Sequence, residues 1–199
     1  MPTTASRARD RQAPLRKAYV DDPALALTTK HVVSVQADSS DTWHGIIATP
    51  EFPGTTWSYG IDAKVGGDDD LPNPGHILCA ALAACLESTT RALAEHLDVE
   101  IEDLVVDVIG YVDARGCLAL DREVRSGFRD IDVDVRLRPG ADTDATRLQT
   151  LFALVEELCV TLDTLRRGVP VNVRTMVDTA SSSDRDGGPA TLPADLASS

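Results

Sequence analysis

Residues 73–97 read NPGHILCAALAACLESTTRALAEHL, and the predicted fold is built around this segment. Asn73 is a good N-cap residue, and Pro74 suits the first helical position, where its missing N–H costs nothing. The ten residues 77–86 are all apolar, so this part of the helix has no polar face. A helix that is apolar all round is buried all round. We therefore predict a central helix of roughly 37 Å through the core, with Cys85 halfway along it.

The length and composition of the chain bound what it can be. Its 199 residues suit one compact domain with tails better than two domains. A hydrophobic content of 43% supplies a core, and a formal net charge of −13 argues against nucleic acid and anionic membranes as partners. Because the all-apolar run is too short to span a bilayer, no segment is predicted to cross a membrane. Four cysteines without a secretory signal indicate a reducing compartment, so we expect a cytoplasmic protein.

The composition of the two ends predicts that both are disordered. Residues 1–12 are Arg-rich but lack the apolar segment of a secretory signal, and a disordered arm is favoured over a transit peptide. Residues 178–199 are rich in Ser, Asp, Gly and Pro. Between these ends we expect a single domain over residues 13–177. It would begin with a short helical arm over residues 13–27, broken at an Asp-Asp-Pro sequence.

Strands are predicted on both sides of the central helix. Residues rich in β-branched side chains predict a three-stranded meander before it, over 28–37, 42–49 and 55–64. An acidic loop with three consecutive aspartates then leads into the helix. A solvated turn is favoured over a cation site there, because no ordered ligand spacing surrounds the aspartates.

After the central helix, strands alternate with one further helix. Strands are expected over residues 104–113, 117–121, 127–138 and 169–177. A second long helix is expected over residues 142–167, where apolar residues recur at helical spacing. The order of elements predicts an α+β fold of antiparallel strands with a long buried central helix and a second long helix.

Two of the four cysteines fall on the predicted core faces of long helices, Cys85 on the central helix and Cys159 on the second. Helices packed in one core can bring such residues within disulfide reach, but the sequence leaves this open. Cys79 is about 9 Å from Cys85 along the axis and on another face, so it cannot bridge to Cys85 within a regular helix. Cys117 lies near a turn. Free cysteine often fills core space, so core filler remains the alternative to chemistry.

The stretch NPGHILCAALAAC, residues 73–85, resembles the signature helix of the OsmC/Ohr family of thiol peroxidases. In that family Asn-Pro or Ser-Pro opens a long buried helix, and an Ala-Ala-Cys or similar triplet carries the peroxidatic cysteine, which implies this role for Cys85. The stretch LCVTLDTLRRGVPVNV resembles the family's second motif and implies that Cys159 is the resolving cysteine. GYVDARG resembles the strand that follows the family's central helix. The resemblance implies an OsmC-like fold and an intertwined homodimer with the central helices inside.

The same resemblance implies a thiol-dependent peroxidase that reduces organic hydroperoxides. Cys85 would attack the peroxide and become a sulfenic acid, and Cys159 would close a disulfide. An external thiol reductant would then recycle the protein. The resemblance implies no cofactor, and the four histidines give no zinc-like spacing with the cysteines, so no metal is expected.

Two residues that the family's peroxidases use are missing. The family usually places Glu after the helix-opening Pro, where Gly75 and then His76 stand here, and it takes an Arg from an N-terminal strand. This chain has no Arg between Arg16 and Arg91. Because burial raises a thiol pKa, Cys85 without a nearby cation should stay protonated. The alternative is therefore an OsmC-like dimer without peroxidase activity that binds a small apolar ligand.

A cation within about 4–6 Å of the Cys85 sulfur would distinguish the two functions. His76 lies about 13 Å from Cys85 along the same helix, and we expect it to belong to the helix cap instead. Arg16, on the N-terminal arm, is a candidate to reach the site from a partner subunit.

Overall fold

The computed structural model describes residues 8–35 and 38–176, and the chain divides into two compact units, residues 1–168 and 169–199. Of the second unit, residues 169–176 are described; they are exposed and have no regular secondary structure. The strand expected over 169–177 is therefore not formed at 169–176, because alternation alone does not make a strand without a hydrogen-bonded neighbour. The expected tail after residue 177 lies outside the described residues, as does the arm over residues 1–7.

The N-terminal part of the chain is more regular than its composition predicts. Helix α1 (Ala8–Asp21) begins within the segment expected to be disordered, so that expectation is wrong for residues 8–12. The Arg9 guanidinium explains this order, since it donates to the carbonyls of Glu95 at 2.9 Å and His96 at 3.2 Å. These carbonyls end the central helix, where the helix dipole favours a cation. Helix α1 is thus attached to the C-terminal end of the central helix.

The predicted meander is confirmed as an antiparallel sheet in the order β1-β2-β3. Its strands are shorter than expected, and none of their residues is fully buried. The strands are β1 (Val33–Val35), β2 (Gly45–Ala48) and β3 (Thr56–Tyr59). Two short 3-10 turns, η1 (Pro23–Ala26) and η2 (Ala63–Val65), flank this sheet in the sequence, the first at the predicted Asp-Asp-Pro break.

The central helix is confirmed as α2 (Pro74–His96), with Asn73 as its N-cap. The Asn73 side chain accepts from the His76 N–H at 3.0 Å, and His76 Nδ1 accepts from the Asn73 N–H at 3.3 Å. This reciprocal capping box satisfies two of the N–H groups at the helix start. His76 therefore belongs to the cap, as predicted.

Within one chain, α2 is buried on one side only. Its buried residues pack toward β4, α4 and α5, whereas the opposite side is exposed at Ala80, Ala81 and Ala84. The helix has 23 residues, with an 18-residue window of mean hydropathy 1.4, so among the described helices it alone could span a membrane by length and composition. The expectation that no segment reaches transmembrane length is therefore wrong. Polar residues follow the all-apolar run, but the mean hydropathy of the longer helix stays high. Core helices of other proteins pass the same test, and one side of α2 packs against β4, α4 and α5.

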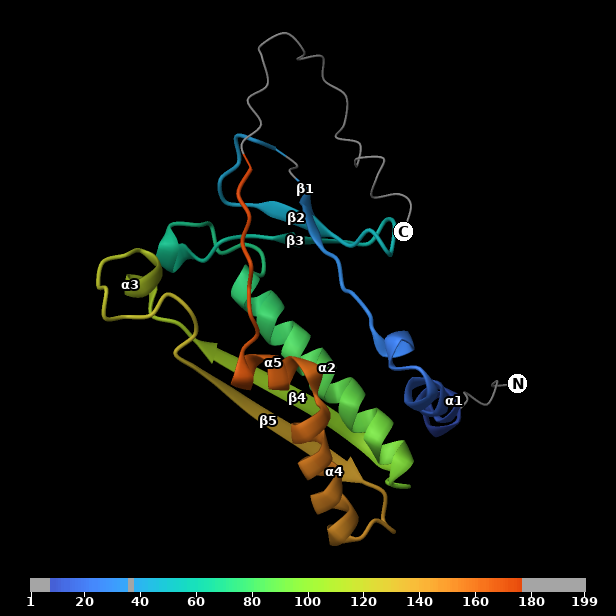
Figure 1. The fold of residues 1–199 in the computed structure, drawn as a ribbon. Helices are drawn as coiled ribbons and strands as arrows, with labels where there is room; N and C mark the ends of the chain where they lie inside the picture. The colour runs from blue at the N-terminus through green and yellow to red at the C-terminus, as the bar shows by residue number, and fades with distance from the viewer. Residues whose placement is uncertain (1–7, 36–37, 177–199) are drawn as a thin grey trace. The chain divides into compact units, whose positions relative to one another are not determined.

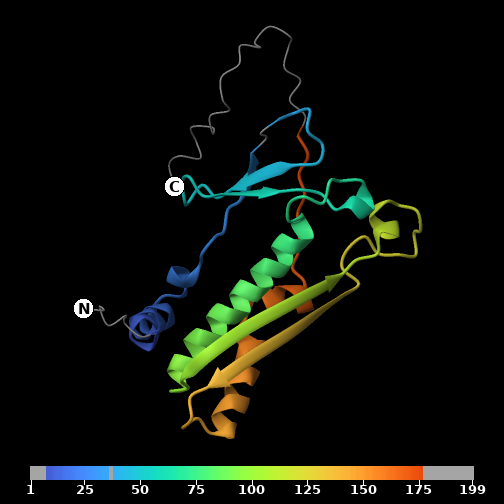
Figure 2. The ribbon, with the colours of Figure 1, turned by 180° about the vertical axis from the view of Figure 1, so that it is seen from behind.

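Strands β4 (Ile101–Tyr111) and β5 (Asp130–Pro139) form a long antiparallel pair, as predicted. Their inward side chains pack against the core, and the aspartates of β5 point outward. Helix α2 lies along β4, on the face of the pair that the inward side chains form (Figures 1 and 2).

Two local expectations after α2 are wrong. The turn and short strand expected over 114–121 contain a helical turn instead, α3 (Ala114–Cys117), because the Asp113 side chain accepts from the Arg115 N–H and caps it. The second long helix is broken into α4 (Ala145–Leu158) and α5 (Val160–Arg167). Cys159 lies at the break with an extended ψ of 109°. Two β-branched residues follow it, and such residues disfavour helix continuation.

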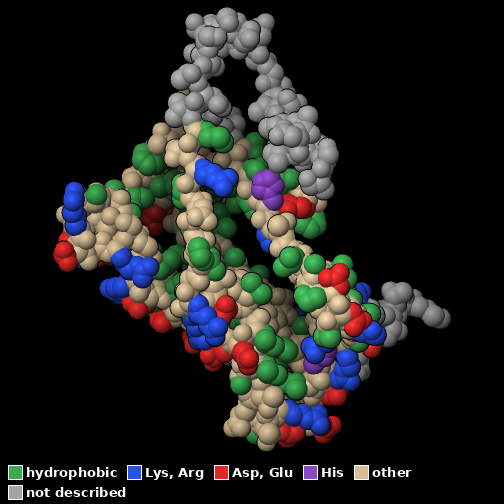
Figure 3. All heavy atoms as spheres, in the orientation of Figure 1, with side chains coloured by type: hydrophobic (Ala, Val, Ile, Leu, Met, Phe, Trp, Pro, Cys, Tyr) green, Lys and Arg blue, Asp and Glu red, His purple; other side chains and the backbone are tan. Residues whose placement is uncertain are grey.

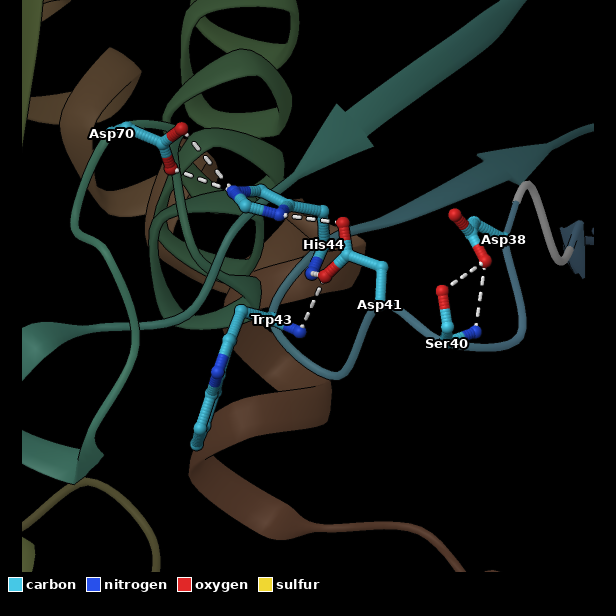
Figure 4. A network of polar contacts seen from close by, with 6 residues as sticks. All are labelled: Asp38, Ser40, Asp41, Trp43, His44 and Asp70. Atoms are coloured by element: carbon cyan, nitrogen blue, oxygen red, sulfur yellow. Dashed lines mark hydrogen bonds and ion pairs between the residues drawn. The ribbon is translucent and has the colours of Figure 1, made fainter.

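A histidine joins the turn before β2 to the acidic loop before α2 (Figure 4). His44 Nδ1 lies 2.9 Å from Asp41, and its Nε2 lies 3.0 Å from Asp70. Asp70 thus pairs with an imidazole, although its aspartate run was expected to be a solvated turn. The hydrogen bonds to Asp70 and to Asp41 raise the pKa of His44 above its ordinary value. The protonated imidazole holds the two segments together.

We expect the His44 contact to stabilise the fold at low pH only. Because the folded pKa is raised, its contribution is complete below the unfolded pKa of about 6.5 and disappears as pH rises through the folded pKa. The effect is small, since the group is exposed and screened. Thermal unfolding of wild type and His44→Gln across this pH range measures it: their difference in Tm should shrink as pH rises. A pH-independent difference would refute this, and His31→Gln is the matched control.

Candidate functional site

The fold brings Cys85 and Cys159 together. Cys85 lies halfway along α2 and is half-buried, while Cys159 lies at the break between α4 and α5 with 0% of its surface exposed. Helix α2 packs against both α4 and α5. Cys85 packs against the buried cluster that contains Cys159, and all four cysteines of the chain are free thiols. The two long predicted helices thus supply one thiol pair.

The surroundings of Cys85 favour its thiolate. Burial raises the pKa of Cys85, but hydrogen bonds outweigh burial and leave the pKa below its ordinary value. The donors are the hydroxyl and the backbone N–H of Thr161, then the Cys159 thiol and the Thr89 hydroxyl. Hydrogen bonds to the charged form of a group favour that form. The pKa of Cys85 is therefore lowered by neutral donors and not by a cation, and a mostly protonated Cys85 at neutral pH stays a prediction.

Cys159 has the opposite tendency. Burial raises the pKa of Cys159, and the hydrogen bond to Cys85 together with the charge of Cys85 raises it further, against the N–H groups of Leu162 and Thr161. The pKa of Cys159 is therefore raised while that of Cys85 is lowered. This division gives the pair one nucleophile and one neighbouring thiol, since the thiolate is the reactive form.

The other two cysteines are placed differently. Cys79 lies six residues earlier on α2, against Gly110 of β4, and burial raises the pKa of Cys79. Cys117 ends α3, where its thiol donates to the Ala114 carbonyl at 3.3 Å and remains exposed. Neither is among the groups that hydrogen-bond to Cys85.

A pocket of about 850 Å³ adjoins the thiol pair. Leu82 and Leu86, which flank Cys85 on α2, line it, as does Leu162 of α5; neither sulfur is among the lining residues. The remaining lining is apolar except where β5, its preceding loop, α4 and α5 contribute charged groups. Among these, Arg166 pairs with Glu156 at 3.0 Å. Acidic and basic side chains intermingle on the face of the molecule drawn in Figure 3.

A cation near the Cys85 sulfur was expected to mark a peroxidase. The groups that lower the pKa of Cys85 are uncharged hydrogen-bond donors instead. Sequence reasoning missed Thr161 and Thr89. A signal for Thr89 was present, because it lies four residues after Cys85 and so on the same face of α2. No such spacing marks Thr161, whose place depends on the break at Cys159.

The fold and the thiol pair define a class of α+β proteins with one cysteine on a central helix and a second beside it. The family described as OsmC-like protein matches residues 67–174, and the chain belongs to this family. The match runs past the end of the first compact unit, so the family's domain includes the start of the second. The resemblance found in residues 73–85 and around Cys159 is thereby confirmed at the level of family.

Solved structures share the fold at low sequence identity. An OsmC-like protein from Mycoplasma pneumoniae is 17% identical, with a TM-score of 0.56 over 70% of this chain and 88% of that one. An OsmC-like protein of unknown function from Vibrio cholerae is 10% identical, with a TM-score of 0.55 over 69% of this chain and 94% of that one. An organic hydroperoxide resistance protein OsmC from Legionella pneumophila is 19% identical, with a TM-score of 0.50 over 70% and 90%. No curated protein sequence matches the chain significantly.

Proposed function

We propose that this protein is a thiol-dependent peroxidase that reduces organic hydroperoxides, with Cys85 as the peroxidatic and Cys159 as the resolving cysteine. The observation that carries the proposal is the thiol pair: Cys85 packs against the buried cluster that contains Cys159, and the pKa of Cys85 is lowered while that of Cys159 is raised. Family membership and a fold shared with a protein named for organic hydroperoxide resistance support the substrate class.

The reaction follows from the chemistry of the pair. The Cys85 thiolate attacks one peroxide oxygen of ROOH, the O–O bond breaks, and the alkoxide takes a proton to leave as ROH while Cys85 becomes a sulfenic acid. The Cys159 thiol then attacks this sulfur, water leaves, and a disulfide forms. An external dithiol restores both thiols and is itself oxidised to a disulfide. A reducing compartment such as the cytoplasm supplies such reductants.

We further propose a homodimer in which the exposed side of α2 is covered by a second copy. The all-apolar run cannot be buried by one chain, which leaves Ala80, Ala81 and Ala84 exposed. Hydrophobic helix faces left open in one chain are typical of obligate interfaces. We take the domain that dimerises to extend through residue 177, since the family match continues to residue 174.

A second candidate function is the binding of a small apolar ligand without turnover. The pocket of about 850 Å³ beside the pair favours it, because neither sulfur lines that pocket.

Peroxide turnover by the purified protein distinguishes these functions. With an excess of cumene hydroperoxide and a dithiol, we expect wild type to consume many equivalents of peroxide per chain, and Cys85→Ser to consume none above the uncatalysed rate. Cys117→Ser, which alters an exposed thiol away from the pair, should turn over like wild type. If Cys85→Ser and wild type both stay at the uncatalysed rate while the protein binds the hydroperoxide, the ligand-binding function replaces the peroxidase.

A further inference from the structure

The side chain of Phe128 lies between two pockets. The pocket beside the thiol pair, of about 850 Å³, and a second pocket of about 820 Å³ at the start of α2 are both lined by Gly127, Phe128 and Arg129. Gly127 has no side chain, and the exposed Arg129 guanidinium pairs with Asp130 at 3.1 Å. The half-buried Phe128 ring is therefore the wall that the two pockets share.

Two glycines leave the space that this ring occupies. A methyl group on Gly110 of β4 would lie 2.7 Å from the ring Cδ1 atom, and one on Gly75 of α2 would lie 3.3 Å from the ring Cζ atom. Carbon atoms in contact lie about 3.5–4.0 Å apart. Next to the ring, the Arg129 N–H donates to the Tyr111 carbonyl at 2.7 Å, which fixes the backbone to β4. The ring is thus held between the backbone of β4 and the first turn of α2.

The pocket beside the thiol pair extends along α2. It is lined by a stripe of three leucines at successive turns of the helix, Leu78, Leu82 and Leu86. This leucine stripe covers roughly 12 Å at about 1.5 Å per residue. One end of it follows Cys85 directly in the sequence, and the other end is three residues from Gly75, where the ring lies. An apolar chain that lies along the leucine stripe from the thiols therefore ends at Phe128.

We propose that Phe128 is a specificity-determining residue that limits the length of the organic group in the hydroperoxide. This inference rests on the proposed function, because the limit acts on a substrate that reacts at Cys85. The organic group of ROOH would lie along the leucine stripe, with its peroxide end toward the thiols and its far end against the ring. A longer group would require the space behind the ring, which belongs to the second pocket. The preferred substrates are therefore apolar alkyl hydroperoxides that fit between the thiols and Phe128.

The binding of primary alkanols, which are the reduced products of alkyl hydroperoxides, measures this limit without any turnover. Displacement of the fluorescent probe N-phenylnaphthylamine from the reduced, full-length protein gives one Kd for each alkanol from hexanol to tetradecanol. Each methylene buried in an apolar site tightens binding about fourfold. In wild type we expect this gain to stop at the length that reaches the ring. In Phe128→Ala the two pockets join, so the gain should continue at about fourfold per methylene beyond that length.

Phe152→Ala is the matched control, because it removes an equal ring of α4 that lines only the pocket beside the thiols. It should keep the wild-type length limit. If Phe128→Ala does not fold, Phe128→Leu should move the limit in the same direction by a smaller amount.

The role of Phe128 would be overturned by the same limit in wild type and a folded Phe128 variant, or by an equal shift in Phe152→Ala. A wild type that binds no alkanol, or that shows no limit in the series, would overturn it as well. Failure of wild-type peroxide turnover would instead overturn the proposed function, so the two failures are distinguishable.

Discussion

The Cys159→Ser variant is expected to consume about one equivalent of organic hydroperoxide per chain and then stop. Cys85 keeps its Thr161 and Thr89 donors in this variant and can still attack the peroxide. Without a second thiol beside it, the sulfenic acid cannot close a disulfide, and it remains or oxidises further. Steady-state turnover with a dithiol should therefore fall to a small residual rate set by direct attack of the reductant.

The amount of peroxide consumed and the mass of the Cys85 peptide measure this together. The expected mass corresponds to one added oxygen on Cys85 in Cys159→Ser, since a second oxygen requires a second equivalent of peroxide, and to none in Cys85→Ser. Cys79→Ser is the matched control, because Cys79 lies on the same helix but against Gly110. It should keep full turnover. Continued rapid turnover of Cys159→Ser would show that another group resolves the sulfenic acid.

The second prediction with a large expected effect is that the protein is a homodimer and that a charge on the exposed side of α2 separates it. Wild type should sediment at twice the 21.3 kDa of one chain, because α2 leaves an apolar side uncovered. Ala84→Glu places a carboxylate in the middle of that side. An unpaired charge buried at an interface costs about 3 kcal/mol or more, which corresponds to at least a roughly 100-fold weaker dimer.

Gln149→Glu gives the matched comparison, since it adds the same charge at an exposed position of α4. Analytical ultracentrifugation of the three proteins at micromolar concentration should show dimer, monomer and dimer. A wild-type monomer, or an undisturbed Ala84→Glu dimer, would contradict the assignment of this face.

The sequence predicted the elements whose signals lie in residues close together in the chain. The cap at Asn73, the apolar run and the alternation along β5 each follow from residues close together in the chain, and α2 and β5 were found where these signals lie. The signature around Cys85 predicted the family. The pairing of Cys85 with Cys159 came from the resemblance, because spacing alone does not bring two helices together.

What the sequence missed depends on tertiary contacts. Helicity at residues 8–12 comes with the contact of Arg9 to the end of α2, far along the chain. The break at Cys159 interrupts a continuous apolar pattern that favours one helix. Because that break creates the α5 N-terminus, the donors to Cys85 could not be inferred either. The search for a cation followed the family's chemistry, whereas hydroxyl, thiol and backbone N–H groups lower the pKa of Cys85 here.

The central claim is that Cys85 reacts with peroxide and that Cys159 resolves it. The most direct measurement is tryptic peptide mapping of the full-length wild type after one equivalent of organic hydroperoxide, without reductant. Our account predicts an intrachain Cys85–Cys159 disulfide, with Cys79 and Cys117 still reduced. A free Cys85 thiol, under conditions that oxidise the exposed Cys117, would contradict it.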